Sequence, residues 1–149
     1  FNISTLGALC IPDNDFLGIL PSTLGVNLPN LEVLNLGSNK FTGIILPTLS
    51  NASKLMSLDL TVNEFFGAIP DSLGSLTFLE ALDLSENNFT LSRDMTFFNS
   101  IGNCRSLIRL SLDENPLNGN LQCLLEIFPT LLNQLMCLIV ELEVKFQGH

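Results

Sequence analysis

A nine-residue pattern, Leu-x-x-Leu-x-Leu-x-x-Asn, recurs five times along this chain of 149 residues. The copies begin at Leu6, Leu31, Leu55, Leu79 and Leu107, and the first has an isoleucine in place of its third leucine. The asparagines that end the copies lie 25, 24, 24 and 28 residues apart. A unit of about 24 residues cannot bury its apolar side alone, so each repeat must stack on its neighbours. The pattern therefore predicts a stacked array.

Each position of the repeat has a physical role. In Leu-x-Leu the side chains alternate, so both leucines face one side of a short strand. The asparagine follows where the chain turns inward, and its amide can bond backbone groups that would otherwise be buried unpaired. We expect a structural ladder of Asn14, Asn39, Asn63, Asn87 and Asn115. Two residues further on, an apolar spine is expected from Phe16, Phe41, Phe65, Phe89 and Leu117.

The second part of the repeat predicts turns. Glycines follow the spine and give the backbone room to turn; they are Gly18, Gly43, Gly67 and Gly119. Proline followed by Ser or Asp, as in Pro21-Ser22 and Pro70-Asp71, suits the start of a short helical turn. We expect 3₁₀ or brief helical turns on the outer side rather than full helices.

The segment Phe65-Phe-Gly67-Ala-Ile69-Pro70 resembles the plant-type leucine-rich repeat, which is marked by a Gly-x-Ile-Pro step. Two further passages, 1–24 and 99–119, are similar to the extracellular domains of plant leucine-rich-repeat receptor-like kinases. This resemblance implies an α/β fold. It would be a right-handed leucine-rich-repeat solenoid with short parallel strands on the concave face and 3₁₀ or short helical turns on the convex face.

The repeats predict a division into residues 1–121, with about five leucine-rich repeats, and residues 122–149, a degenerate repeat or irregular tail. Two departures occur within the array. Leu46 stands where the pattern has proline, with Pro47 one residue late, and the fourth full repeat carries an insertion over 91–103. No leader, membrane helix, nucleotide loop or kinase motif is visible. We interpret the chain as a fragment or a truncated gene product.

Composition excludes several classes of function. Six basic residues against fifteen acidic ones give a net charge of −9, which disfavours binding to nucleic acid or to anionic membranes. The only histidine is the last residue, His149, and the four cysteines form no CxxC pair. The sequence therefore predicts no metal site, no cofactor and no catalytic residues. Cys104 is expected to be buried, whereas Cys123 and Cys137 could pair in principle.

The resemblance implies ligand binding on the concave face, and the alternation of side chains predicts which residues lie there. The candidates are Asn35, Asp59, Asp83, Arg109, Ser111, Glu64 and Glu86. Eight of the fifteen acidic residues fall on the expected concave strands or just beyond them, where only Lys40 and Arg109 offset them: Asp13, Asp15, Asp59, Glu64, Asp83, Glu86, Asp113 and Glu114. One interpretation is a surface that attracts a basic peptide or protein. The other is a solvated acidic face that keeps the protein in solution.

Three sequons match the pattern for N-glycosylation, at Asn2, Asn51 and Asn88. With 16 Asn and 22 Ser plus Thr, chance alone gives roughly 2.4 matches. The sequons are therefore no independent evidence of secretion. An extracellular or plasma-membrane location, on the ectodomain side, follows from the family resemblance.

The resemblance implies that the chain is the ligand-recognition segment of a plant cell-surface receptor-like kinase. It would bind a peptide or protein in signalling or defence, together with a co-receptor, and a Ser/Thr kinase domain would lie elsewhere in the parent. The alternative is a secreted binder similar to the plant inhibitors of polygalacturonases. The long fourth repeat favours the receptor, because compact inhibitors keep a tighter period.

Overall fold

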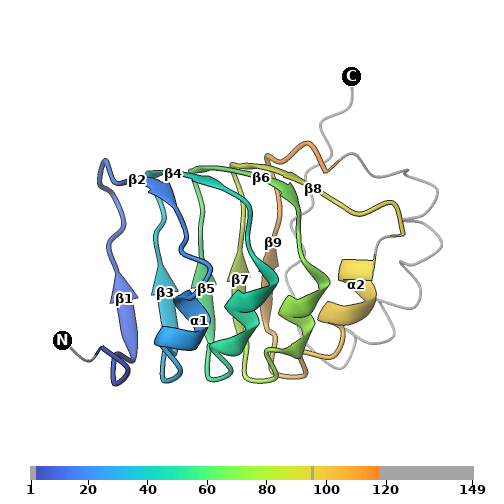
Figure 1. The fold of residues 1–149 in the computed structure, drawn as a ribbon. Helices are drawn as coiled ribbons and strands as arrows, with labels where there is room; N and C mark the ends of the chain where they lie inside the picture. Colours follow the sequence, from blue (N-terminus) through green and yellow to red (C-terminus); the bar gives the residue numbers. More distant parts are fainter. Residues whose placement is uncertain (1–2, 95, 118–149) are drawn as a thin grey trace.

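The computed structural model describes residues 3–94 and 96–117, and it shows a solenoid of stacked coils (Figure 1). The coils stack side by side from the N-terminal end, so the expected stacked array is confirmed. Asn2, Gly119 and the expected tail 122–149 lie outside the described residues. Among the described residues, no helix has the length and apolar character needed to span a bilayer.

A five-stranded parallel sheet forms the concave side. Its strands are β1 (Ala8–Cys10), β3 (Val33–Asn35), β5 (Ser57–Asp59), β7 (Ala81–Asp83) and β9 (Arg109–Ser111), paired in that order. The register aligns the middle leucine of every repeat, which gives the row Leu9, Leu34, Leu58, Leu82 and Leu110. Three of these, Leu34, Leu58 and Leu82, are completely buried. The expected parallel strands are thus present, and their inward face forms one wall of the core.

A second parallel sheet, which the sequence did not predict, covers one side of the stack. It consists of β2 (Leu17–Ile19), β4 (Lys40–Gly43), β6 (Glu64–Ala68) and β8 (Asn88–Thr90), in that order. In the register each glycine pairs with the spine Phe of the next coil, as Gly43 does with Phe65. Gly18, Gly43 and Gly67 have φ of 118°, 91° and 83°, a region that favours glycine. The three glycines therefore lie within strands of this sheet and not in a simple turn.

Short helical turns make up the convex side. They are α1 (Leu24–Asn27), η1 (Pro47–Asn51), η2 (Asp71–Ser75) and α2 (Thr96–Ile101), of which η1 and η2 are 3₁₀ helices. The shifted proline of the second coil, Pro47, is accommodated without a change in the turn. Pro47 is the first residue of η1, where the missing N–H has no helical partner in any case. Pro70 holds the preceding, N-cap position of η2.

The insertion in the fourth repeat contributes to the core instead of forming a loose loop. It contains α2, whose Phe97, Phe98 and Ile101 are buried. The two rings meet edge to face with centroids 5.4 Å apart, a favoured geometry for aromatic pairs. The helix packs against η2 of the preceding coil (Figure 1). The inserted residues therefore enlarge one coil of the stack.

The phenylalanine spine stacks as expected from the sequence. Successive ring centroids from Phe16 through Phe41 and Phe65 to Phe89 are 6.5, 6.4 and 6.1 Å apart, with interplanar angles of 23°, 10° and 8°. Phe65 and Phe89 are fully buried, whereas Phe16 in the first coil is 48% exposed. Leu117 packs partly buried against the same core. Burial of the spine therefore increases inward from the first coil.

Candidate ligand-binding surface

The side chains of the asparagine ladder join consecutive coils. Asn39 Oδ1 accepts a hydrogen bond from the Phe16 N–H at 3.0 Å, and Asn39 Nδ2 donates to the carbonyl of Ile11 at 2.9 Å, both in the preceding coil. The same amide also donates to Leu36 and Gly37 of its own coil. Equivalent sets of bonds are made by Asn63, Asn87 and Asn115. Their amides thus bond backbone groups where the concave sheet turns toward the second sheet.

The first ladder position differs from the others. Asn14 Nδ2 donates to the carbonyls of Pro12 and Ile11, both in its own coil, at 2.7 and 3.3 Å. The residue is exposed, whereas Asn39 and Asn87 are 8% and 7% exposed. Among the described residues no buried side-chain nitrogen or oxygen lacks a hydrogen-bond partner. The polar groups of the turn are therefore satisfied along the described stack.

The concave sheet brings four of the candidate binding residues into one row. Asn35, Asp59, Asp83 and Ser111 end successive strands and are register partners of one another. All four are partly exposed. Arg109 begins β9 and is exposed, two residues before Ser111 on the same strand. The row is therefore a strip of polar side chains across the coils.

Hydrogen bonds within each coil orient the acidic side chains of this row. Asp59 Oδ1 accepts from the backbone N–H and the hydroxyl of Thr61, at 3.0 and 2.6 Å. Asp83 Oδ1 accepts equivalent bonds from Ser85 at 3.2 and 2.8 Å. Asn35 Oδ1 accepts from the Gly37 N–H in the same way. These side chains therefore stabilise the turn that follows each strand, a role that the spacing Asp-x-Thr or Asp-x-Ser could have indicated.

One serine connects the carboxylates of two coils. The Ser85 hydroxyl lies 2.8 Å from Asp83 Oδ1 and 2.6 Å from Asp113 Oδ1, and Ser85 is 7% exposed. A hydroxyl has a single proton to donate, so the two carboxylates share it. Among the described residues neither Asp83 nor Asp113 has an ion-pair partner. Two carboxylates that form no ion pair with any described residue therefore lie at one end of the polar row, the end that also presents Arg109.

Two candidates from the sequence lie away from the concave sheet. Glu64 begins β6 and belongs to the second sheet, because the backbone resumes extended pairing directly after Asn63. Glu86 lies in the turn before β8 with φ of 52°. The same left-handed conformation recurs one residue before each ladder asparagine, at Asp13, Ser38, Val62, Glu86 and Glu114. Alternation along a strand could not place these residues, since they follow the point where the strand ends.

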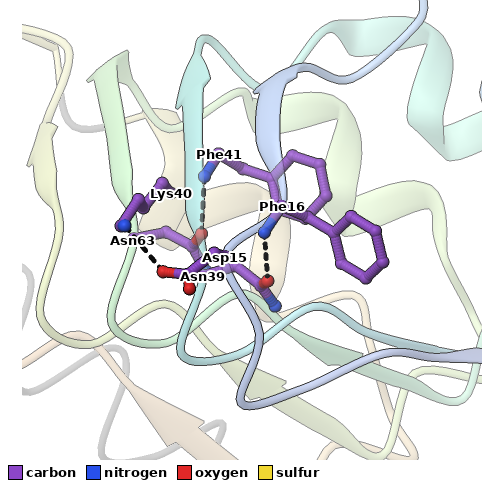
Figure 2. A network of polar contacts seen from close by, with 6 residues as sticks. All are labelled: Asp15, Phe16, Asn39, Lys40, Phe41 and Asn63. Carbon is purple, nitrogen blue, oxygen red and sulfur yellow. Dashed lines mark hydrogen bonds and ion pairs between the residues drawn. The ribbon is translucent and has the colours of Figure 1, made fainter.

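The basic residue Lys40 does not offset the concave carboxylates. Its Nζ lies 2.6 Å from Asp15 Oδ1, and both side chains are exposed beside the ladder (Figure 2). The hydrogen bond and charge of Lys40 lower the pKa of Asp15, and Asp15 in turn raises the pKa of Lys40. Exposed pairs of this kind are screened by solvent and salt. Arg109 is therefore the one basic side chain that the described part of the concave sheet presents.

The cysteines and sequons occupy distinct environments. Cys104 is buried, as expected, and its thiol donates to the Leu73 carbonyl at 3.6 Å, whereas Cys10 is exposed. Burial raises the pKa of the Cys104 thiol to about 11. Within residues 3–94 and 96–117, no three His, Cys, Asp or Glu side chains are grouped to hold a metal. Asn51 and Asn88 are both exposed, at the end of η1 and the start of β8.

Comparisons with known proteins agree with this geometry. The Leucine Rich Repeat family model matches residues 30–52 and 54–76. The structure of PEPR1 with AtPEP1 is 39% identical, with a TM-score of 0.69 over 76% of this chain and 15% of that one. The Arabidopsis receptor kinase HAESA, in complex with the peptide hormone IDA and the co-receptor SERK1, is 29% identical, with a TM-score of 0.68 over 76% of this chain and 18% of that one. No curated protein matches the sequence.

A plant ice-binding protein has the same fold, with 28% identity and a TM-score of 0.63 over 72% of this chain and 34% of that one. Each of these structures is therefore much longer than the part that this chain spans. The chain is a leucine-rich repeat protein, and its repeats match those of plant receptor kinase ectodomains. Because the fold also occurs in an ice-binding protein, the ligand must be argued from the surface.

Proposed function

We propose that this chain is a ligand-recognition segment of a plant cell-surface receptor-like kinase and that it binds a peptide or protein on its concave sheet. The structure of HAESA in complex with the peptide hormone IDA supports this assignment. The similarity to PEPR1 in its complex with AtPEP1 supports it as well. The SERK1 co-receptor in the HAESA complex supports a co-receptor as a second partner. The chain itself contributes binding, on the extracellular side, and the kinase belongs to another part of the parent protein.

The observation that carries the proposal is the acidic end of the polar row. Asp83 and Asp113 share the proton of Ser85 and have no ion-pair partner among the described residues. A cationic side chain placed there would compensate two fixed carboxylates whose positions are already set by hydrogen bonds, so little side-chain entropy is lost on binding. The surface therefore favours a ligand with Lys or Arg. Asp59 extends the same charge by one coil.

Amide substitutions test this proposal without disturbing the turns. Asp59→Asn and Asp83→Asn remove charge, while an amide oxygen can still accept the bond from the backbone, as Asn35 does in its own coil. The matched control is Asp71→Asn, which removes an exposed carboxylate from the convex turn η2. Binding is measured by calorimetry with synthetic peptides of equal length that carry either Arg or Glu between Gly and Ser spacers.

We expect the Arg peptide to bind the parent and the Asp71→Asn variant equally, and to bind the two concave variants at least about tenfold more weakly. Added salt should weaken parent binding, because the attraction is electrostatic. Equal affinity for the Arg and Glu peptides would show that the carboxylates of the polar row only form a solvated face. A lack of binding to any peptide, by a folded chain, would contradict the concave recognition surface.

A further inference from the structure

The outer face of the second sheet presents an asparagine beside an exposed aromatic ring. Asn88, the first residue of β8, is the register partner of Phe66 on β6. Phe65 and Phe89 are fully buried, so alternation turns Phe66 and Asn88 to the outer face. Phe66 is 50% exposed, and Asn88 is also exposed. Neighbouring strands lie about 4.8 Å apart, so the amide and the ring share one small area of surface.

Asn88 begins the sequon Asn88-Phe89-Thr90 on this face. Asn88 and Thr90 are two residues apart on β8 and lie on the same side of it, with the buried Phe89 between them. Within the described part of the chain, neither the Asn88 amide nor the Thr90 hydroxyl makes a side-chain hydrogen bond. The adjacent Asn87 is 7% exposed and is fully bonded in the ladder. The register of the repeat thus leaves Asn88 available for modification.

The second sheet and the residue that follows β4 carry further exposed apolar side chains. Leu17, Ile19 and Ile44 are 77%, 69% and 45% exposed on the same side of the stack. Ile44 lies against Gly67, the residue that follows Phe66, because a Cβ on Gly67 would be 2.9 Å from Ile44 Cγ2. A sugar has a face of C–H groups that can lie on the negative face of an aromatic ring, while its hydroxyls remain in water. A glycan at Asn88 can therefore cover the exposed ring of Phe66 while its hydroxyls stay in water.

We propose that Asn88 carries an N-linked glycan whose first N-acetylglucosamine packs on the ring of Phe66. In the transfer, Asn88 Nδ2 bonds to C1 of the first sugar of a polyprenyl-diphosphate-linked oligosaccharide. The bond from C1 to the diphosphate oxygen breaks, the lipid diphosphate leaves, and the amide nitrogen loses one proton. The inference rests on the proposed extracellular location, because this transfer takes place in the secretory pathway.

Asn51 provides a matched control within the same chain. Its sequon, Asn51-Ala52-Ser53, is also exposed at the asparagine, but Asn51 ends a 3₁₀ turn on the convex side and has no strand partner with an aromatic ring. A sugar at Asn51 therefore adds bulk without the ring contact. Phe66→Thr is a suitable variant of the ring, since Thr42 and Thr90 hold the corresponding position in the neighbouring coils.

The experiment uses the full chain secreted from a eukaryotic host. Glycans are released enzymatically in heavy-oxygen water, and mass spectrometry locates the labelled asparagines. We expect label at Asn88. An Asn88 that is not labelled in secreted, folded protein overturns the proposal.

Thermal unfolding then tests the ring contact. After trimming to a single N-acetylglucosamine, we expect the sugar at Asn88 to raise the unfolding temperature by about 2–4 °C relative to Asn88→Gln. We expect this increment to vanish with Phe66→Thr and to be absent for the sugar at Asn51, compared with Asn51→Gln. An unchanged increment in Phe66→Thr would overturn the packing. If a chain glycosylated at Asn88 bound no peptide, this result would contradict the proposed function and would leave the glycan proposal standing.

Discussion

The side chain of Asn63 holds the backbone of Phe41, which lies one coil earlier: Asn63 Oδ1 accepts a hydrogen bond from the Phe41 N–H at 2.9 Å (Figure 2). Asn63 Nδ2 donates to the Leu36 carbonyl of the same earlier coil at 3.0 Å. One amide therefore bonds both the chain leaving the concave sheet and the chain entering the second sheet. Loss of this side chain would leave backbone groups between two coils unpaired.

We predict that Asn63→Ala lowers the free energy of unfolding by about 1–3 kcal/mol, because it leaves buried backbone groups without partners. Denaturant unfolding followed by circular dichroism measures the change. The control is Asn14→Ala, since Asn14 is exposed and bonds only its own coil. Equal losses in the two variants would show that the bonds between coils contribute nothing beyond the local turn.

Gly74 permits the close approach of two convex turns. A Cβ on this residue would lie 2.2 Å from the Ser100 carbonyl oxygen in the next coil. We predict that Gly74→Ala lowers the free energy of unfolding by about 1–3 kcal/mol through overpacking, measured by denaturant unfolding. Gly7→Ala is the control, because the nearest atom to its Cβ, the Asn30 carbonyl oxygen, is 3.9 Å away. A tolerated Gly74→Ala would mean that η2 and α2 can separate freely.

Burial along the phenylalanine spine predicts unequal effects of truncation. Phe65 is fully buried between the rings of Phe41 and Phe89, whereas Phe16 is 48% exposed and stacks on one ring only. Phe65→Ala should cost about 3–5 kcal/mol in unfolding free energy, and Phe16→Ala clearly less. Thermal and denaturant unfolding of the two variants make the comparison. A larger effect at Phe16 would contradict the placement of the first coil at the exposed end of the spine.

Burial of the Cys104 thiol predicts that the protein loses stability at high pH. Burial raises the pKa of this thiol from the ordinary 9.0 to about 11. As the pH rises, the unfolded chain therefore loses the thiol proton of Cys104 at a lower pH than the folded chain does. The contribution of this thiol to the free energy of unfolding is complete below pH 9 and is lost as the pH rises toward 11. The unfolding free energy of the parent should decrease over this range, and that of Cys104→Ala should decrease less. Cys10→Ala, at an exposed thiol, should behave like the parent.

The sequence predicted the parts of the binding surface that repeat within a strand. The row of Asn35, Asp59, Asp83 and Ser111 follows from the alternation of side chains next to the buried leucines, and the parallel register then brings these residues together. The bridge from Asp83 through Ser85 to Asp113 was not predicted. It depends on the stagger between two coils that are separated by the longest repeat, and the spacing within one repeat carries no information about that stagger.

The second sheet shows a similar limit. The glycines at 18, 43 and 67 were interpreted as turn residues, yet their positive φ serves strands that pair across coils. Pairing between strands depends on the neighbour that each coil meets, so a pattern within one coil does not determine it. The same reason explains why Glu64 lies on β6 and why Lys40 pairs with Asp15 instead of facing the concave carboxylates.

The sequence by itself determined the period, the inward residues and the roles of asparagine and phenylalanine, because each of these follows from burying an apolar face in a unit of about 24 residues. Only the tertiary structure decided what lies between coils: the second sheet, the shared proton of Ser85, and the meeting of Asn88 with Phe66. These features depend on the offset between stacked neighbours. That offset is set by packing of the whole array, and so it is visible only once the coils are placed against one another.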